Sequence, residues 1–177
     1  MNQIAKLTLV IAGLVAAVKA TTVAASEILT QSQVANLARS VTSQYFQNVD
    51  PDMIRAMVEI ESSRNKNAFR YEWHISDAST GLMQVLAGTA KWLYDDMGYR
   101  GIMSKSPTMA DMFEPRISVY FGAAYIDWLQ KYHRSKKGGE ASEEWLVRAY
   151  NGGPGGAGNG QTAHHWSKYQ TAKAGLA

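Results

Sequence analysis

The stretch "MVEIESSRNKNAF", residues 57–69, decides the fold, because it brings two glutamates to the end of a predicted helix. The helix begins in "NVDPDM", where Asp50 can act as the capping residue and Pro51 takes the first helical position. Its pattern then runs to about Ser62. Carboxylates two positions apart on a helix point in different directions, so we expect the two glutamates to meet different surroundings.

Helical phase separates the two glutamates. Three apolar residues of this helix occupy positions i, i+3 and i+4, namely Ile54, Met57 and Val58. The next inward position is i+7, which is Glu61. Glu59 follows Arg55 by four residues on the polar side, where an Arg–Glu pair is an ordinary solvated contact. The pattern therefore predicts Glu61 on the apolar face and Glu59 outside it.

A carboxyl group on an apolar stripe invites a chemical interpretation. Burial makes a carboxylate costly to ionise, and an acid that stays protonated near neutral pH can protonate the oxygen of a departing sugar. On the residues alone, Glu61 is a candidate general acid, or a residue that caps the helix end or meets a buried arginine.

The rest of the chain favours a mainly helical fold in one domain. Further helices are expected over residues 27–46, over 90–97 with Thr89 as the cap and Gly98 as the stop, over 113–133 as the longest, and around Trp166 and Tyr169. Another helix starts at Ser142 and ends in the loop "GGPGGAGNG", with Gly152 in the left-handed conformation. Strand signals are weak and confined to short pieces between residues 69 and 86.

The N-terminal residues 1–25 read as a signal peptide or another targeting segment. One lysine precedes an apolar run from Leu7 to Val18, and small residues offer cleavage after Ala20 or Ala25. The run is shorter than the roughly 20 residues of a membrane span. An uncleaved anchor and an organelle-targeting segment, such as one for the chloroplast, remain alternatives. The domain proper is then residues 26–177.

Composition excludes several classes of function. The chain has no cysteine, which excludes disulfides, Cys-ligated zinc and thiol catalysis. It carries 18 basic and 15 acidic residues, and two of the lysines lie in the leader, so the remainder is 16 minus 15, or +1. The basic run "KYHRSKK", residues 131–137, is typical of a solvated helix end, and we expect no nucleic-acid partner. The four histidines lack metal-ligand spacing, so neither a metal nor a cofactor is expected.

Four short motifs occur in an order that resembles a known family. They are "IESS", "STGLMQ", "GTA" and "RAYNGG", within residues 50–170. In order and separation they are similar to lytic transglycosylases of the soluble, family-1 type, which have a lysozyme-like fold with a substrate cleft, and to goose-type lysozymes. The longer segments "RYEWHISDAST" and "DMGYR" are more similar to plant and algal relatives.

The resemblance implies roles for individual residues. Glu61 would be the single catalytic acid and base, with Ser62 as its neighbouring helper, and Tyr150 and Asn151 would face Glu61 across the cleft. An amide and a phenol suit that position, because they hydrogen-bond sugar hydroxyls without acting as acids. Without the ordered motifs, Tyr150 could equally be a core residue and Asn151 a helix cap.

The resemblance also implies roles for residues about twenty positions after the helix that ends near Ser62. The cleft segment would be Gly81, Leu82, Met83 and Gln84, with Gln84 contacting the sugar and Leu86 in the place of a frequent methionine. Core packing is the competing interpretation for Leu82 and Met83.

The resemblance implies cleavage of the β-1,4 bond in peptidoglycan or a related aminosugar polymer. The protein would be a secreted or cell-envelope monomer, and it would contact the membrane only if its leader is not cleaved. In a transglycosylase, Glu61 would then deprotonate the 6-hydroxyl of the same sugar, and the product would be a 1,6-anhydro sugar. In a hydrolytic lysozyme or chitinase-like glycosidase, Glu61 or a second carboxylate would activate water. Asp77 is the candidate for that second carboxylate, although a turn residue bonding its own backbone is the competing interpretation. Arg64, Lys66 and Ala87 depart from the family pattern, which keeps an inactive glycan-binding protein as a further alternative.

Overall fold

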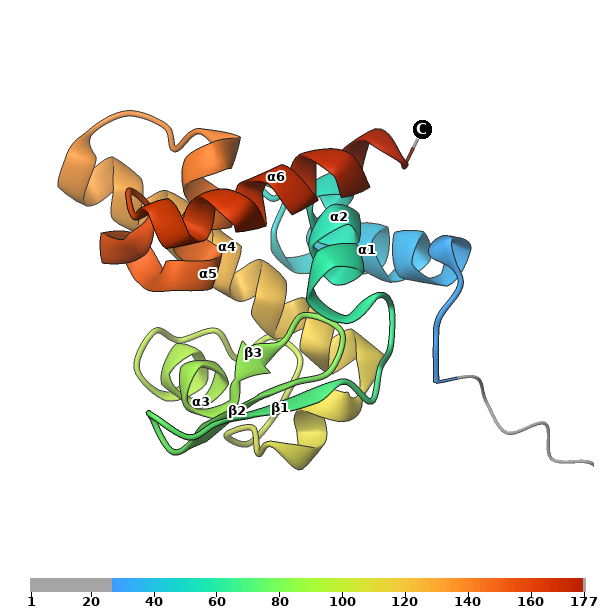
Figure 1. Cartoon of the computed structure of the whole chain (residues 1–177). Coiled ribbons are helices and arrows are strands. Elements are labelled where there is room, and N and C mark those ends of the chain that lie inside the picture. Colours follow the sequence, from blue (N-terminus) through green and yellow to red (C-terminus); the bar gives the residue numbers. More distant parts are fainter. Residues whose placement is uncertain (1–26, 177) are drawn as a thin grey trace, which may run out of the picture.

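The computed structural model describes residues 27–176, and within them the protein is mainly helical (Figure 1). The expected leader lies outside the described residues. In chain order the helices are α1 (Gln31–Tyr45), α2 (Pro51–Ser62), α3 (Ala87–Asp95), the 3₁₀ helix η1 (Ala110–Phe113), α4 (Pro115–Lys137), α5 (Glu143–Gly156) and α6 (Gly160–Ala174). The strands are β1 (Phe69–Glu72), β2 (Asp77–Thr80) and β3 (Val85–Leu86). These elements confirm the predicted fold class.

The first two helices begin where their capping residues dictate. The Thr30 side chain accepts a hydrogen bond from the Gln33 backbone N–H, and the Gln33 side chain accepts one from the Thr30 backbone. This reciprocal capping box starts α1 at residue 31, so the predicted start at residue 27 is wrong. Asp50 accepts from the N–H of Asp52 and Pro51 takes the first helical position, which confirms the predicted start of α2.

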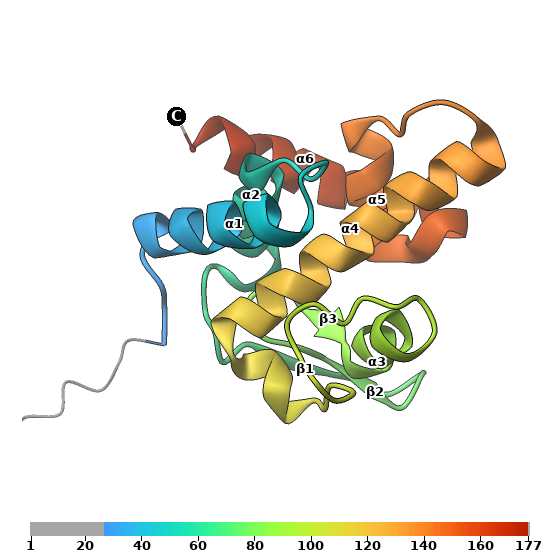
Figure 2. The same cartoon turned by 180° about the vertical axis from the view of Figure 1, so that it is seen from behind.

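The three strands form a small antiparallel sheet in the order β1-β2-β3. Phe69 lies opposite Thr80 in the first pair, and Thr80 opposite Val85 in the second. All three lie within residues 69–86, as predicted. Figures 1 and 2 show the sheet and α3 on one side of α4, with α1, α2 and α6 on the other side.

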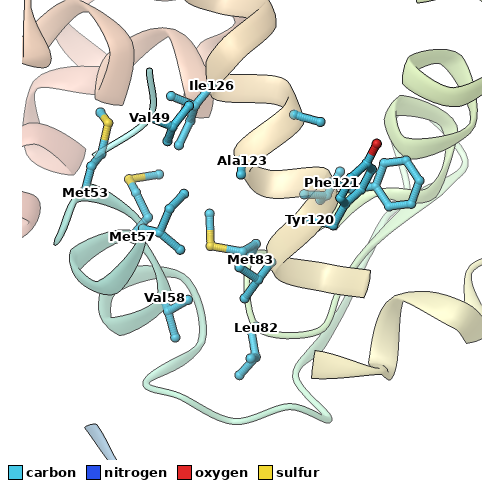
Figure 3. Packing of buried hydrophobic residues seen from close by; sticks show 14 of the residues in the cluster. Val49, Met53, Met57, Val58, Leu82, Met83, Tyr120, Phe121, Ala123 and Ile126 are labelled. Atoms are coloured by element: carbon cyan, nitrogen blue, oxygen red, sulfur yellow. The ribbon is translucent and has the colours of Figure 1, made fainter. Parts of the chain in front are cut away.

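Helix α4 is the centre of the core. Its buried side chains include Phe121 and Ile126, which belong to the same core cluster as Met53 and Met57 of α2 and Met83 (Figure 3). Burial of each large apolar side chain stabilises the fold by about 1.5–3 kcal/mol. The last turn of α4 carries exposed basic residues, which confirms the solvated helix end. No helix in the described part of the chain is both long and apolar enough to cross a membrane.

Two glycines let the segment after β2 lie directly against its neighbours. Gly81 has a φ of 72°, and a methyl group there would collide with the carbonyl oxygen of Met112 and lie 2.8 Å from Ser118 Oγ. On α4, a methyl group at Gly122 would lie 2.5 Å from the Met83 side chain. Ser118 also accepts a hydrogen bond from the Met83 N–H, at 3.1 Å. These contacts fix residues 81–84 on α4.

Two predicted details near the later helices are wrong. Helix α3 begins at Ala87 directly after β3, with Leu86 as an N-cap residue that makes no side-chain hydrogen bond, so Thr89 lies inside the helix. Helix α5 runs to Gly156 and contains a kink at Gly153, whose φ is 72°.

The left-handed residue is thus Gly153 and not Gly152. The following Pro154 lacks an N–H and breaks the helical ladder, so the conformational freedom is needed immediately before it. Gly152 is required for a different reason, because a methyl group there would lie 2.7 Å from the Thr162 side chain.

Candidate active site

A cleft of about 460 Å³ lies where the sheet meets the ends of several helices. The sheet and its turns contribute Arg70, Glu72, His74, Ile75, Ser79, Gln84, Val85 and Leu86. The helices contribute Glu61, Thr89, Tyr125, Tyr150, Asn151, Gly152 and Gly153. Of the residues predicted for the site, the cleft thus brings together Glu61, Gln84, Leu86, Tyr150 and Asn151.

The two glutamates of α2 lie in different surroundings, as helical phase predicts. The Glu61 side chain lines the cleft and is 13% exposed, whereas that of Glu59 is 34% exposed and does not line it. Both come from the last turn of α2, whose apolar face packs on the core through Met57 and Val58. The core thus fixes the direction in which Glu61 points.

Glu59 pairs with a different arginine from the one predicted. Its carboxylate lies 2.9 Å from Nε of Arg64, and Arg55 instead binds Asp52 at 2.8 Å. The cause is the left-handed turn that ends α2, in which Ser63 has a φ of 49° and Arg64 a φ of 67°. This turn returns Arg64 to the helix end, where its guanidinium also donates to the carbonyl of Leu29. Arg64, a departure from the family pattern, therefore joins the end of α2 to the segment before α1.

Among the described residues, the ionisable side chain that pairs with Glu61 is His165 of α6. Its Nε2 lies 3.0 Å from Glu61 Oε1, and each side chain is 13% exposed. The ring N–H direction is not aligned for a hydrogen bond, and Nε2 is buried with no hydrogen-bond partner among the described residues. Sequence reasoning considered His165 only as a metal ligand and missed this contact, because the pairing of α6 with α2 is not encoded in local spacing.

The segment 81–84 divides between core and cleft. Met83 and Leu82 are fully buried, in agreement with the core interpretation, and neither they nor Gly81 lines the cleft. Gln84 does line it, in a left-handed conformation with a φ of 47°. Its side-chain NH₂ donates to the carbonyls of Ala68 and Gly81, at 3.1 and 3.0 Å. The amide oxygen of Gln84 is thereby held in place as an acceptor.

Tyr150 is fixed by a hydrogen bond to the opposite segment. Its hydroxyl donates to the carbonyl of Met83 at 2.8 Å, and its ring lies 5.4 Å from that of Tyr125. Burial, together with the charge of Glu61, raises the pKa of Tyr150 well above its usual value. Burial also raises the pKa of Tyr125 to about 12, so both phenols remain protonated at neutral pH. Asn151, the next residue of α5, is exposed in the cleft.

Two predicted residues are held away from the cleft by backbone hydrogen bonds. The Ser62 hydroxyl donates to the carbonyl of Val58 at 3.1 Å, within α2. The Asp77 carboxylate accepts from the N–H groups of Ala78 and Gly88, at 2.7 and 2.9 Å. Asp77 thus ties β2 to the first turn of α3, and neither it nor Ser62 lines the cleft.

Glu72 is the cleft carboxylate that sequence reasoning missed. It lines the cleft on β1, where Arg70 Nε donates to it at 2.6 Å and the Ser79 hydroxyl at 3.3 Å. The signal was the strand period in "FRYE", because successive side chains of a strand point to opposite faces. Arg70 and Glu72 line the cleft and the intervening Tyr71 does not, whereas His74 and Ile75 line it from the turn that follows β1.

This arrangement suits acid–base chemistry on a polyhydroxylated substrate. It offers one poorly exposed carboxyl group without an arginine or lysine partner among the described residues, surrounded by amide and phenol groups. No group of three or more His, Asp or Glu side chains among residues 27–176 could hold a metal ion. The side chains that line the cleft can transfer protons and form hydrogen bonds.

Comparison with known proteins gives a family match and partial relatives. The family model described as "Transglycosylase SLT domain" matches residues 41–173. The "Endo-type membrane-bound lytic murein transglycosylase A" of Salmonella typhimurium (strain LT2) and that of Salmonella enteritidis PT4 are each 36% identical to this chain over 83 residues. The aligned region is 46% of this chain and 36% of each relative, so the match spans about a third of these relatives.

Proposed function

The chain belongs to the transglycosylase SLT domain family, and from this membership and the cleft we propose that it cleaves peptidoglycan. The bond is the β-1,4 link between N-acetylmuramic acid and N-acetylglucosamine, and Glu61 is the single acid and base. The observation that carries the proposal is the position of Glu61, which lines the cleft at the end of α2 with a side chain that is 13% exposed. The names of the relatives, lytic murein transglycosylases, support the same substrate.

In the proposed reaction Glu61 gives one proton to the departing oxygen and then receives a different proton from the substrate. Glu61 protonates the glycosidic oxygen as the bond from that oxygen to the sugar C1 breaks, and the substrate's own N-acetyl group stabilises the oxocarbenium-like centre. The carboxylate then takes the proton of the 6-hydroxyl of the same sugar while that oxygen bonds to C1. The product is a 1,6-anhydro sugar and no water is consumed.

The other cleft residues are proposed to hold the substrate. The Gln84 amide oxygen is positioned to accept a hydrogen bond from a sugar, because its NH₂ group is already engaged by two carbonyls. Asn151 offers both donor and acceptor, and Leu86 with Tyr125 supplies apolar surface. Tyr150 is proposed to keep the two sides of the cleft at a fixed separation through its hydrogen bond to Met83.

Hydrolysis is the second candidate, because Glu72 lines the same cleft. A second carboxylate could activate water, as inverting glycosidases require. Two contacts weigh against this role for Glu72 in the free protein, since Arg70 and Ser79 already donate to its carboxylate. Asp77, whose two oxygens each accept a backbone N–H, is the weaker candidate of the two.

Product analysis distinguishes the two reactions. Purified peptidoglycan is digested with the protein, and the soluble fragments are examined by mass spectrometry for their terminal sugars. We expect 1,6-anhydro ends, which are lighter than reducing ends by one water. Predominantly reducing ends would establish the hydrolytic alternative. Binding of the polymer with no release of fragments would support the alternative of an inactive glycan-binding protein.

The proposed place of action is the cell envelope, with the protein working as a monomer. The substrate lies there, and the relatives are named as membrane-bound. Residues 1–25 are proposed as a leader, removed after Ala20 or Ala25. N-terminal sequencing of the protein from the producing cell is expected to begin at residue 21 or 26. A start at residue 1 or 2 would instead indicate an uncleaved segment.

A further inference from the structure

The contact between Glu61 and His165 involves two side chains that are almost enclosed. Nε2 of His165 lies 3.0 Å from Oε1 of Glu61, and both side chains are 13% exposed. Nε2 is buried and has no hydrogen bond from any described residue. A buried polar atom without a partner is destabilising, so its persistence beside a functional carboxyl group calls for an explanation.

We propose that His165 is a positioning residue for Glu61: its Nε2–H donates to Oε1 and leaves Oε2 as the oxygen that carries the transferable proton. This inference rests on the proposed function, in which Glu61 must enter the reaction protonated. A protonated carboxyl group has one O–H and one carbonyl-type oxygen, and the carbonyl-type oxygen is the acceptor. An N–H donor at Oε1 therefore selects the position of the proton.

The opposite tautomer would hinder the reaction. If Nε2 carried no hydrogen, it would accept the Glu61 proton and compete with the glycosidic oxygen for it. The ring N–H in the free protein is not aligned with Oε1, although the two atoms are already 3.0 Å apart. Catalytic hydrogen bonds are often poorly aligned before substrate binds and tighten afterwards. We therefore place the full hydrogen bond in the substrate complex.

The packing of α6 supports a positioning role. Helix α6 is fixed against α2 and α5 through buried Tyr169 and Thr162. The Thr162 hydroxyl donates to the carbonyls of Gly156 and Asn159 and accepts from Arg148. The backbone that carries His165 is thus held between two anchored residues of the same helix, which keeps residue 165 beside Glu61.

Three substitutions test the proposal, with His164 as the matched control because it is the same residue type, adjacent and exposed. We expect His165→Phe to lower kcat on peptidoglycan about tenfold, because it removes one hydrogen bond to a reacting group, and to keep KM within about twofold of the wild type. His165→Gln is expected to keep at least about half of kcat, because its amide N–H can donate to Oε1. His164→Phe is expected to match the wild type.

A spectroscopic measurement tests the contact without turnover. In the ¹⁵N spectrum of the histidine rings, the Nε2 signal of His165 is expected to show the Nε2–H tautomer and to shift in Glu61→Leu. The signals of His164 are expected to stay unchanged. A bare Nε2 on His165 in the wild type would overturn the proposal, and so would equal spectra for His165 in the two proteins.

The kinetic outcomes separate this inference from the proposed function. An active wild type with a dead Glu61→Gln variant and a fully active His165→Phe variant would overturn the role of His165 alone. A His165→Gln variant as slow as His165→Phe would also overturn it, since the donor would then not be the feature that matters. If Glu61→Gln cleaves as fast as the wild type, the proposed function itself fails.

Discussion

Glu61→Gln is expected to reduce the release of soluble fragments from peptidoglycan by at least about 10³-fold, because an amide cannot give a proton to the glycosidic oxygen or take one back. Loss of general acid–base catalysis costs about 10²–10⁴-fold, and in this mechanism one group performs both steps. Glutamine has nearly the same shape as glutamate, so the cleft and the contact with His165 are retained. The measurement is kcat from the rate of fragment release.

Glu59→Gln is the matched control for this prediction. It is the same change two residues earlier on the same helix, and it removes only a partly exposed ion pair with Arg64. Exposed and half-exposed pairs contribute at most about 1 kcal/mol to stability, so we expect kcat within about twofold of the wild type. Equal binding of all three proteins to insoluble peptidoglycan would show that the loss in Glu61→Gln lies in the chemistry. A fast Glu61→Gln variant with a slow Glu59→Gln variant would contradict the assignment.

Local pattern was sufficient for the residues whose position follows from one element. The phase of α2 placed Glu61 inside and Glu59 outside, because Met57 and Val58 fix the rotation of the helix. The capping signals at Asp50 and Pro51 predicted the start of the same helix. Both inferences use contacts within about one turn of helix, where sequence spacing and spatial distance are nearly equivalent.

Contacts between residues that lie far apart in the sequence could not be predicted from local pattern. His165 approaches Glu61 from α6, about a hundred residues further along the chain, and no periodicity connects the two. The partner of Glu59 was also mispredicted, because it depends on left-handed backbone at Ser63 and Arg64, which these residue types rarely adopt. Gln84 likewise takes a positive φ, in a turn that its side-chain hydrogen bonds to the carbonyls of Ala68 and Gly81 stabilise.

Gly81→Ala is expected to destabilise the protein by about 2–5 kcal/mol, the largest stability effect that we predict for one methyl group. The left-handed backbone at residue 81 costs about 1–2 kcal/mol with a side chain present. The new methyl group would also collide with the Met112 carbonyl, which is backbone and cannot rotate away, and overpacking of this kind costs about 1–3 kcal/mol. The midpoint of thermal unfolding, followed by circular dichroism, is expected to fall by about 10 °C.

Gly98→Ala separates the two causes. Gly98 has a φ of 78°, close to the 72° of Gly81, but a methyl group there meets nothing within 4 Å. We therefore expect only the backbone cost, about 1–2 kcal/mol, and normal cleavage of peptidoglycan. Equal destabilisation by the two substitutions would show that residues 81–84 can move away from η1, against the close packing that the structure shows.

Gly81→Ala is also expected to damage the active site in molecules that remain folded. The Gly81 N–H donates to the carbonyl of Ala68 at 2.8 Å, and the Gly81 carbonyl accepts from Gln84 Nε2 at 3.0 Å. A shift of residue 81 therefore moves the amide of Gln84, the group proposed to bind the sugar, and the carbonyl of Met83 that holds Tyr150. We expect kcat/KM for Gly81→Ala to fall about tenfold even at temperatures well below its unfolding midpoint, because misplacement of substrate-positioning groups is costly. Unchanged kcat/KM at those temperatures would mean that the 81–84 segment does not position the substrate, whatever its contribution to stability.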